Sequence, residues 1–303
     1  MSASEEDIQA SAAVTNLKPK SLLEDTSHCF REREIVQIDG DLSGLETFAT
    51  GPAPKAGEKG RFVSLLSADG FLDADLLITP LENGVLIDVH SALADGVAGR
   101  LVQLDGVTGV DRSAARRWRV FGELPDQKSQ DTGFETIRFA DNRRRELGAR
   151  VYRDAAEPEG FDWRHSRKWD GHAMRLGIVP DHRCLIGKEV TPAEAGFHRL
   201  LGGKDADPVP DLARRILPMR VEPSGSAIAP MTGEPILADG VEIGRVLDHE
   251  GVCAVAIITI APWRQAIADG ARIKCRDEQV SLLWPTWLSS ESQGNFGPAA
   301  TQI

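Results

Sequence analysis

Three short apolar segments joined by tight turns constrain the fold of this chain more than any other feature. Residues 62–66, 72–78 and 85–89 are rich in Leu, Ile and Val, and each has the length of a single β-strand. The turns between them, at 68–70 and 82–84, both end in Gly, which accepts the positive φ that hairpin turns require. The sequence therefore predicts an antiparallel sheet in the first third of the chain.

Further elements on both sides extend this sheet into an α+β unit. A strand is expected at 35–38, and Leu and Val side chains recur on one helical face of residues 91–104. Two more strands are expected at 106–112 and 118–124. This order of strands and helix is typical of a ferredoxin-like unit.

The C-terminal third of the chain has a different pattern. From about Leu212, short apolar segments alternate with turns of Gly, Asp and Pro, and one short helix is expected at 262–270. Many short strands of this kind are typical of a small β-barrel. We therefore predict a barrel at 211–290.

Composition limits the classes of function. A chain of 303 residues can form two or three domains. The net charge of −11 and the pI of about 5.2 argue against a nucleic-acid partner, because phosphate binding needs a basic surface. They also argue against a polybasic membrane anchor, and no apolar run approaches the roughly 20 residues that span a bilayer. The acidic N-terminal segment lacks the apolar region of a signal peptide, so we expect a cytoplasmic protein.

Neither the cysteines, nor the histidines, nor a run of arginines indicates a functional site by itself. The four cysteines are far apart in the sequence and form no CxxC pair, so we expect free thiols and no bound metal. The seven histidines lack the spacing of a helical metal site. The arginine run at 139–152 is expected to form a solvated face.

The segment GKEVTPAEAGFHRLLGG, residues 187–203, carries the most specific local pattern. It fits the start of a helix, with Thr191 as N-cap, Pro192 in the first turn and Glu194 completing a capping box. A carboxylate at this position can also accept two hydrogen bonds from a planar, amidine-like edge such as that of a pterin. The local pattern favours the cap, and the two roles are compatible in one residue.

Four segments occur in the same order as in one known superfamily. GKEVTPAEAGF, residues 187–197, resembles the signature of the folate-binding aminomethyltransferases, the T-proteins of glycine cleavage. Residues 34–40 resemble the first strand of their YgfZ-type relatives, and residues 61–78 resemble a strand–turn–strand common to both branches. Residues 233–260 resemble the C-terminal barrel. The resemblance spans roughly residues 33–288, and the chain length favours the YgfZ-type branch.

The resemblance implies an α+β fold in which two ferredoxin-like domains and a C-terminal small β-barrel surround a central pocket. Folate would bind in the first domain, which would be discontinuous in sequence. The expected division is a disordered tail at 1–30, a folate-binding domain at 31–60 and 120–210, an inserted ferredoxin-like domain at 61–119, the barrel at 211–290 and a tail at 291–303.

The resemblance also implies roles for individual residues. Glu194 matches the glutamate that holds the pterin ring in the T-proteins. Asp73 matches a carboxylate beside the reactive nitrogen of the folate, where it could act as a catalytic acid. Trp169 and Phe197 could stack on the rings of the ligand, and Arg175 could pair with its glutamate tail. The alternatives are structural: a surface carboxylate beside a turn, core aromatic residues and a solvated helix face.

One hallmark of the YgfZ family is missing. The motif KGCYxGQE should follow residue 197, where this chain instead reads GGKDADPVPDLARRILP. RCLIGKE, at 183–189, has a superficial likeness but precedes TPAEAG. The loss argues against a cysteine-dependent activity.

Three hypotheses for the function follow from the resemblance. In the leading one, a YgfZ-like protein binds tetrahydrofolate and assists the assembly or repair of iron–sulfur proteins, with iron–sulfur client or assembly proteins as partners and a link to tRNA modification. The second hypothesis is a folate-dependent aminomethyl or methyl transferase. The third is a non-catalytic scaffold that has lost the ligand site.

Overall fold

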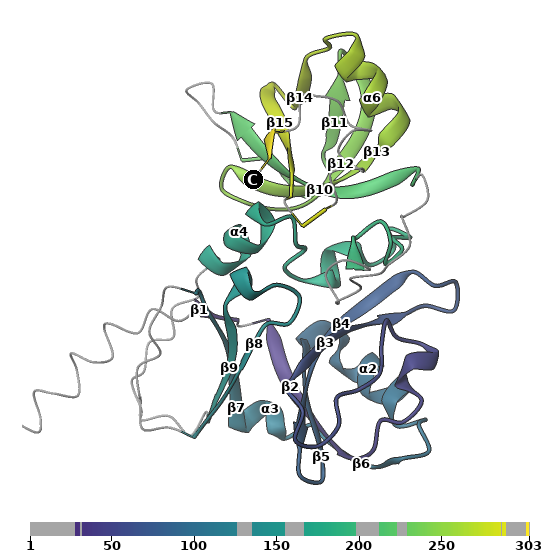
Figure 1. The fold of residues 1–303 in the computed structure, drawn as a ribbon, viewed down its shortest axis with the longest axis vertical. Helices are drawn as coiled ribbons and strands as arrows, with labels where there is room; N and C mark the ends of the chain where they lie inside the picture. Colours follow the sequence, from purple (N-terminus) through teal and green to yellow (C-terminus); the bar gives the residue numbers. More distant parts are fainter. Residues whose placement is uncertain are drawn as a thin grey trace, which may run out of the picture.

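The computed structural model contains three β-sheets (Figure 1). The N-terminal sheet and a smaller second sheet lie side by side at one end of the molecule, and a barrel forms the other end. Helix α4 (Lys168–Arg175) lies between the second sheet and the barrel. The described residues are 28–30, 32–125, 135–154, 167–197, 212–222, 229–285, 287–288 and 301–302.

The N-terminal sheet contains the predicted hairpins. Its strands run in the order β3-β4-β5-β2-β6, and every neighbouring pair is antiparallel. Helix α2 follows β5, within the segment where the sequence predicts a helix. The elements are β2 (Arg33–Gly40), β3 (Arg61–Leu66), β4 (Leu72–Leu81), β5 (Gly84–His90), α2 (Ala94–Leu101) and β6 (Val107–Asp111).

Apolar side chains cover this sheet on both faces. On one face, Leu76 of β4 packs in a cluster with Val97 and Leu101 of α2. Leu77 points the opposite way, because side chains alternate along a strand, and belongs to the cluster that includes Trp169 of α4. Fully burying one such side chain stabilises the fold by about 1.5–3 kcal/mol. The second face therefore joins the N-terminal sheet to the rest of the chain.

The second sheet has four strands and is also antiparallel, in the order β1-β7-β9-β8. Its strand β7 contacts β2 of the N-terminal sheet. A long-range pairing brings β1, from the start of the described chain, to the edge of this sheet. The strands are β1 (His28–Cys29), β7 (Trp118–Glu123), β8 (Thr136–Ala140) and β9 (Ala149–Asp154).

The C-terminal third forms a closed β-barrel, as the sequence predicts. Strand β10 pairs with both β13 and β15, so six strands close a ring in the order β10-β13-β12-β11-β14-β15. The short strand β16 (Thr301–Gln302) pairs with β15 in parallel. The other elements are β10 (Arg214–Glu222), β11 (Pro235–Ala238), β12 (Val241–Glu250), β13 (Cys253–Thr259), α6 (Ile260–Ala268), β14 (Ile273–Cys275) and β15 (Glu278–Trp284).

The remaining described helices are short. They contribute single turns between strands, or between a strand and a longer helix. No described helix has both the length and the apolar character needed to cross a membrane. The short helices are η1 (Leu45–Thr47), η2 (Ser91–Leu93), α3 (Ala114–Arg117), η3 (Arg145–Leu147) and η4 (His182–Leu185).

The sheet pairing differs from the expected division of the chain. Strand β2 lies between β5 and β6, so residues 31–60 share a sheet with 61–119 rather than with 120–210. The physical reason is that Val36 and Ile38 of β2 are buried in the same apolar cluster as the helix α2. Over the described residues 32–125 the order of elements also differs from the βαββαβ order of a ferredoxin-like unit. The predicted tails fall mostly outside the described residues.

The close approach of two strands at Gly84 gives a first testable prediction. A Cβ atom at this position would lie 2.2 Å from the carbonyl oxygen of Ile38, and φ is +144°. Gly84→Ala should therefore lower the free energy of unfolding by about 3 kcal/mol in urea denaturation, because overpacking adds to backbone strain. Gly70→Ala is the matched control, since Gly70 also has a positive φ but a Cβ there would meet no atom within 4 Å. An equal loss in both variants would contradict the prediction.

Candidate ligand-binding site

A pocket of about 460 Å³ lies where the chain before β2, helix α4, the η4 segment and the barrel come together. Its wall combines residues from the segments 30–33 and 167–184 with residues 232 and 248, which are brought together by the fold. This volume is within the range of about 300–1,000 Å³ that small-molecule pockets occupy. We call it the junction pocket, and its lining residues are Phe30, Glu32, Arg33, Arg167, Asp170, Pro180, Asp181, Arg183, Cys184, Thr232 and Asp248.

Arginines and carboxylates face one another around the junction pocket. Arg167, just before α4, donates to Asp170 at 3.1 Å and to Asp248 of β12 at 3.3 Å. Nη1 of Arg183, in η4, lies 3.6 Å from Glu32 Oε2. The first two contacts join the start of α4 to the barrel, and the third joins η4 to the chain before β2. They leave charges of both signs on the pocket wall. The wall therefore suits a ligand that carries both an anionic group and hydrogen-bond donors.

Arg33, the first residue of β2, contacts three carboxylates at the junction pocket. Its Nη1 donates to Asp75 Oδ2 at 2.7 Å, and its Nε donates to a carboxylate oxygen of Asp88. The same Nη1 lies 3.4 Å from Asp181 Oδ2. The three carboxylates come from β4, β5 and the chain before η4. Because Arg33, Asp75 and Asp88 are buried, each depends on the others to offset the cost of leaving water.

The carboxylates of the pocket differ in their affinity for a proton. Burial alone would raise the pKa of Asp75, but nearby positive charge, chiefly that of Arg33, holds this pKa well below its usual range. Burial raises the pKa of Asp181, and the charge of Asp75 adds to the effect. Burial also raises the pKa of Asp170, against the opposing charge of Arg167. Asp170 and Asp181 line the pocket and are therefore suited to hold or transfer a proton there.

His182, which follows Asp181, belongs to the core. Its ring stacks on Phe197 at 5.2 Å and meets the ring of Phe62 edge-on at 5.7 Å. Its Nδ1 lies 3.5 Å from Ser64 Oγ. Burial lowers the pKa of His182 to about 4, so the ring is uncharged at neutral pH.

Glu194, the predicted pterin-binding carboxylate, is engaged inside the protein. The N–H of Thr191 donates to Glu194 Oε2 at 2.8 Å, and the N–H of Glu194 donates to Thr191 Oγ1 at 3.2 Å, which confirms the predicted capping box. Arg214 Nε donates to Glu194 Oε1 at 2.9 Å. Glu194 is buried and does not line the junction pocket. A pterin edge would have to displace Arg214 to reach it.

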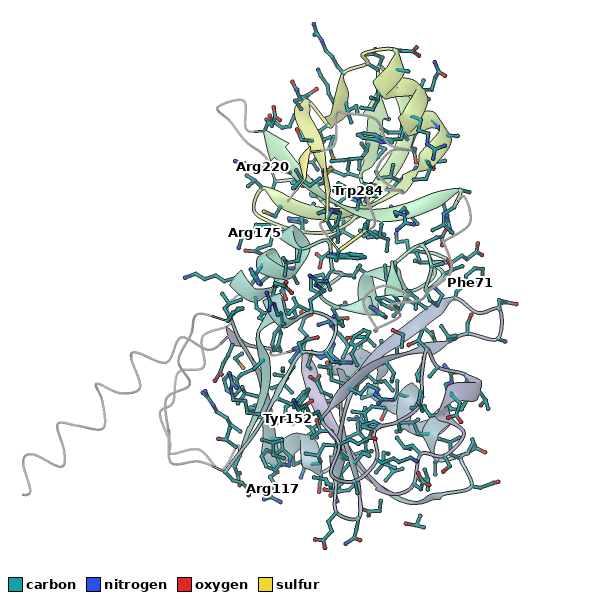
Figure 2. The ribbon with its side chains drawn as sticks, viewed as in Figure 1. Phe71, Arg117, Tyr152, Arg175, Arg220 and Trp284 are labelled. Carbon is teal, nitrogen blue, oxygen red and sulfur yellow. The ribbon has the colours of Figure 1, made fainter. Side chains whose placement is uncertain are left out.

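The two other charged residues assigned to the ligand also lie away from the pocket wall. Asp73 is half-exposed, and its Oδ2 accepts a hydrogen bond from Arg100 of α2 at 2.9 Å. The carboxylate that reaches Arg33 is that of Asp75, two residues further along β4. Arg175 is exposed at the end of α4, at the outer side of the molecule (Figure 2). Neither side chain lines the junction pocket.

The two aromatic residues assigned to the ligand belong to the core. Trp169 is buried, and its Nε1 donates to the carbonyl of Leu147 at 3.1 Å. The ring of Phe197 is covered by His182. Phe30, which meets Trp169 edge-on at 5.1 Å, does line the pocket. Stacking on a ligand in the junction pocket would therefore involve Phe30.

Sequence reasoning missed most of the pocket wall. Phe30, Arg33 and Asp248 come from separate segments, and only the fold brings them together. Asp181 could have been predicted as a helix N-cap, because it stands directly before a short helix. Its Oδ1 accepts the N–H of Arg183 at 2.8 Å, which is the N-cap pattern.

The arginine run at 139–152 is not the solvated face that its composition predicts. Arg143 and Arg150 are buried, whereas the side chain of Arg145 is 94% exposed. The reason is that Asp141, in the same run, supplies a buried counter-charge and accepts hydrogen bonds from Arg143 Nε and Nη2 at 3.0 and 2.7 Å. The position of Arg150 inside a strand segment with apolar neighbours could have indicated that its side chain is buried.

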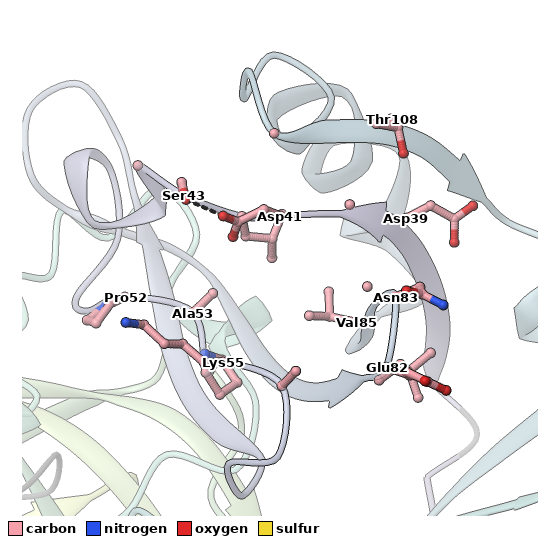
Figure 3. A pocket seen from close by; sticks show the side chains of 18 of the residues that line it. Asp39, Asp41, Ser43, Pro52, Ala53, Lys55, Glu82, Asn83, Val85 and Thr108 are labelled. Atoms are coloured by element: carbon pink, nitrogen blue, oxygen red, sulfur yellow. Dashed lines mark hydrogen bonds between the residues drawn. The ribbon is translucent and has the colours of Figure 1, made fainter.

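A larger hollow, of about 930 Å³, lies at the end of the N-terminal sheet (Figure 3). The end of β2, the turn between β4 and β5 and a proline-containing loop form its wall. Its rim carries Asp39, Asp41 and Glu82 against one cation, Lys55, and Asp41 accepts a hydrogen bond from Ser43 (Figure 3). The acidic rim disfavours an anionic ligand. The junction pocket is therefore the stronger candidate site.

Comparisons with known proteins support the same architecture. Residues 214–290 match the family model described as the CAF17 C-terminal beta-barrel domain. No curated protein matches the sequence of the chain. A solved structure with a similar fold is the glycine cleavage system aminomethyltransferase T from Bartonella henselae, at 13% sequence identity and a TM-score of 0.59, with 89% of each chain covered.

The fold class follows from these findings. The chain has the fold of the glycine cleavage aminomethyltransferases over most of its length. At this level of identity the likeness is one of fold alone. Its C-terminal domain is a six-stranded closed barrel, and residues 214–290 match the CAF17 barrel family model.

The buried ring of His182 predicts a specific pH dependence of stability. Unfolded His182 binds a proton below about pH 6.5, whereas the folded residue binds it only below about pH 4. Between these values the unfolded state binds more protons, so stability falls as the pH drops, by about 3 kcal/mol from this residue. His182→Phe keeps an aromatic ring beside Phe197 and Phe62 and removes the titration.

Urea unfolding at about pH 7 and about pH 4.5 checks this prediction. The variant should lose less free energy of unfolding between the two conditions than the wild type. The two proteins differ in no titratable side chain other than residue 182, so the comparison isolates the imidazole. Equal losses in the two proteins would contradict the assignment.

Proposed function

We propose that this protein binds a tetrahydrofolate in the junction pocket and acts as a YgfZ-like accessory protein in the assembly or repair of iron–sulfur proteins. The junction pocket would then be the central pocket of the fold. One observation carries the proposal: in a chain with the aminomethyltransferase fold, the pocket is open, and one aromatic ring, three arginines and four carboxylates line it. The CAF17-type barrel supports the same assignment.

Each part of a tetrahydrofolate would find a complementary group on this wall. The pterin ring is planar and carries N–H donors along one edge, which a carboxylate such as Asp170 or Asp248 could accept in pairs if Arg167, their present partner, shifts. The ring of Phe30 offers a surface for stacking. The carboxylates of the glutamate tail suit Arg183, whose partner Glu32 lies 3.6 Å away. A ligand with an anionic tail and a donor-rich ring therefore fits the charge pattern of the pocket.

Asp181 gives the pocket a capacity for proton exchange. Burial raises the pKa of Asp181, and its carboxyl group lines the pocket, where it could exchange a proton with an amine nitrogen of the ligand. Contacts with the N–H of Arg183 and with Arg33 fix its position. Orientation and protonation of a bound folate thus require no cysteine.

Cys184 also lines the pocket but is poorly suited to act as a nucleophile. Its Sγ donates a hydrogen bond to the carbonyl of Asp181 at 3.2 Å. Burial raises the pKa of the Cys184 thiol well above its ordinary value, and the reactive form of cysteine is the thiolate. This agrees with the absence of the KGCYxGQE motif from the sequence.

The transferase alternative would need a different acid from the one that the sequence indicates. Asp73 is paired with Arg100 and does not line the pocket, so Asp181 would have to act in its place. This alternative requires a one-carbon product that Asp181→Asn abolishes. Absence of such a product from the wild-type protein would exclude it.

The scaffold alternative is disfavoured by the pocket itself. A protein that had lost its ligand would be expected to fill the site with side chains, but the junction pocket is open. Glu194 does not line the pocket, so its presence in the sequence does not bear on this point.

Isothermal titration with 5-formyl-tetrahydrofolate tests the ligand. The wild type should bind it. Asp181→Asn should weaken binding by about tenfold, because it removes the titrating carboxylate while keeping an oxygen that can accept the N–H of Arg183. Asp73→Asn is the matched control and should bind as the wild type does. Absence of heat together with an unchanged melting temperature would overturn the folate proposal, and equal effects of the two substitutions would overturn the site.

The accessory role requires a separate test in cells. A strain that lacks this protein should show reduced activity of its iron–sulfur enzymes. The wild-type gene and Asp73→Asn should restore this activity, whereas Asp181→Asn should restore it poorly. Full activity in the deletion strain, with unchanged cluster content, would contradict the role while leaving ligand binding intact.

A further inference from the structure

Arg150, on strand β9, is a buried cation whose donors are not used within the described protein. It is 0% exposed. Its Nε, Nη1 and Nη2 have no hydrogen-bond partner among the described residues. Its Nε lies 3.8 Å from Asp141 Oδ2, which is too long for a hydrogen bond. A planar group with five N–H donors is thus buried without an acceptor.

The neighbouring buried arginines are satisfied. Arg33 donates to the carboxylates of Asp75 and Asp88. Arg143 donates to Asp141 through two nitrogens and lies 3.3 Å from the carbonyl of Val179 through the third. Arg150 is therefore an exception within its own cluster, and a buried polar group of this kind requires an explanation.

Two aromatic rings hold the guanidinium of Arg150 in place. Its central carbon lies 4.1 Å from the ring centroid of Phe30 and 4.4 Å from that of Trp169. The two rings are nearly perpendicular to each other, so they enclose the guanidinium on two sides. Neither ring supplies a conventional hydrogen-bond acceptor, so the nitrogens of Arg150 remain without one among the described residues.

The space for this arrangement depends on Gly122. Gly122 of β7 is the direct cross-strand partner of Arg150. A Cβ atom at position 122 would lie 2.6 Å from Trp169 Cδ1 and 2.9 Å from ring carbons of Phe30. The absence of a side chain at position 122 allows both rings to lie beside Arg150.

Arg150 stands directly behind the wall of the junction pocket. Phe30 lines this pocket and covers Arg150. The backbone of Phe30 is anchored, because its N–H donates to the carbonyl of Val120 and its carbonyl accepts the N–H of Arg33. The ring of Phe30 is therefore the part of this residue that can turn to open the pocket toward Arg150.

We propose that Arg150 is an anion anchor of the junction pocket and that the ring of Phe30 is its movable cover. The ligand would be a small molecule with a carboxylate or phosphate group, which accepts hydrogen bonds from the free edge of Arg150 when the ring turns aside. The inference rests on the proposed function in placing a ligand in the junction pocket, but it does not require that ligand to be a folate.

Nitrogen-15 NMR of the full-length protein, labelled at arginine, tests the anchor directly. Arg150→Lys removes one Nε–H signal and so identifies it, while the positive charge stays in the cluster. Formate is titrated at constant ionic strength against chloride, and inorganic phosphate is titrated separately. The Arg150 signal should shift saturably with at least one of the two anions. A response to formate alone indicates a carboxylate group, and a response to phosphate alone indicates a phosphate group.

Two further variants sharpen the result. Phe30→Ala removes the cover and should bind the anion several-fold more tightly, although it loses a stacking surface for a folate. Arg153→Lys is the matched control, because Arg153 is a buried arginine of the same strand that stacks on Phe121 and lies 3.5 Å from Glu123. It should leave the Arg150 response unchanged.

The outcomes separate this inference from the folate proposal. An Arg150 signal that no anion shifts, as expected if only a buried water occupies the donor edge, would overturn the anchor even if 5-formyl-tetrahydrofolate binds. An anion response without binding of 5-formyl-tetrahydrofolate would support the anchor and count against the folate.

Discussion

The buried guanidinium of Arg33 is the group that links three strands of the N-terminal sheet to the pocket wall. It bonds to Asp75 of β4 and Asp88 of β5, and it approaches Asp181 at the edge of the junction pocket. A guanidinium has donors in fixed directions, so it sets the positions of these carboxylates relative to one another. Because a buried charge without its partner is costly, the cluster is maintained as a unit.

This cluster also explains why the pocket wall carries carboxylates with different proton affinities. Asp75 stays ionised because of the charges around it, whereas burial raises the pKa of Asp181 and of Asp170 on the pocket side. Behind the same wall, the aromatic rings of Phe30 and Trp169 hold Arg150 with its donor edge unused. The pocket therefore combines carboxyl groups of raised pKa with the ring of Phe30, and the unpaired cation of Arg150 lies behind that ring. Such a combination suits a ligand with both basic nitrogens and acidic groups.

The parts of the structure that could be predicted from sequence are those set by local interactions. The hairpins, the short strands of the barrel and the capping box of Thr191 and Glu194 all depend on residues close together in the chain. The pocket could not be predicted in this way, since Arg33, Asp181 and Asp248 meet only in the fold. The family resemblance indicated the fold class and assigned the ligand to Glu194 and Asp73; in the structure these residues pair with Arg214 and Arg100.

The central claim is that the junction pocket is the ligand site of this protein. A crystal structure of the complex with 5-formyl-tetrahydrofolate tests it most directly. We predict ligand density in the junction pocket, with the pterin ring against Phe30 and hydrogen-bonded to a carboxylate of its wall. Density instead beside Glu194, with Arg214 displaced, or in the acidic hollow at the β4–β5 turn, would contradict the account.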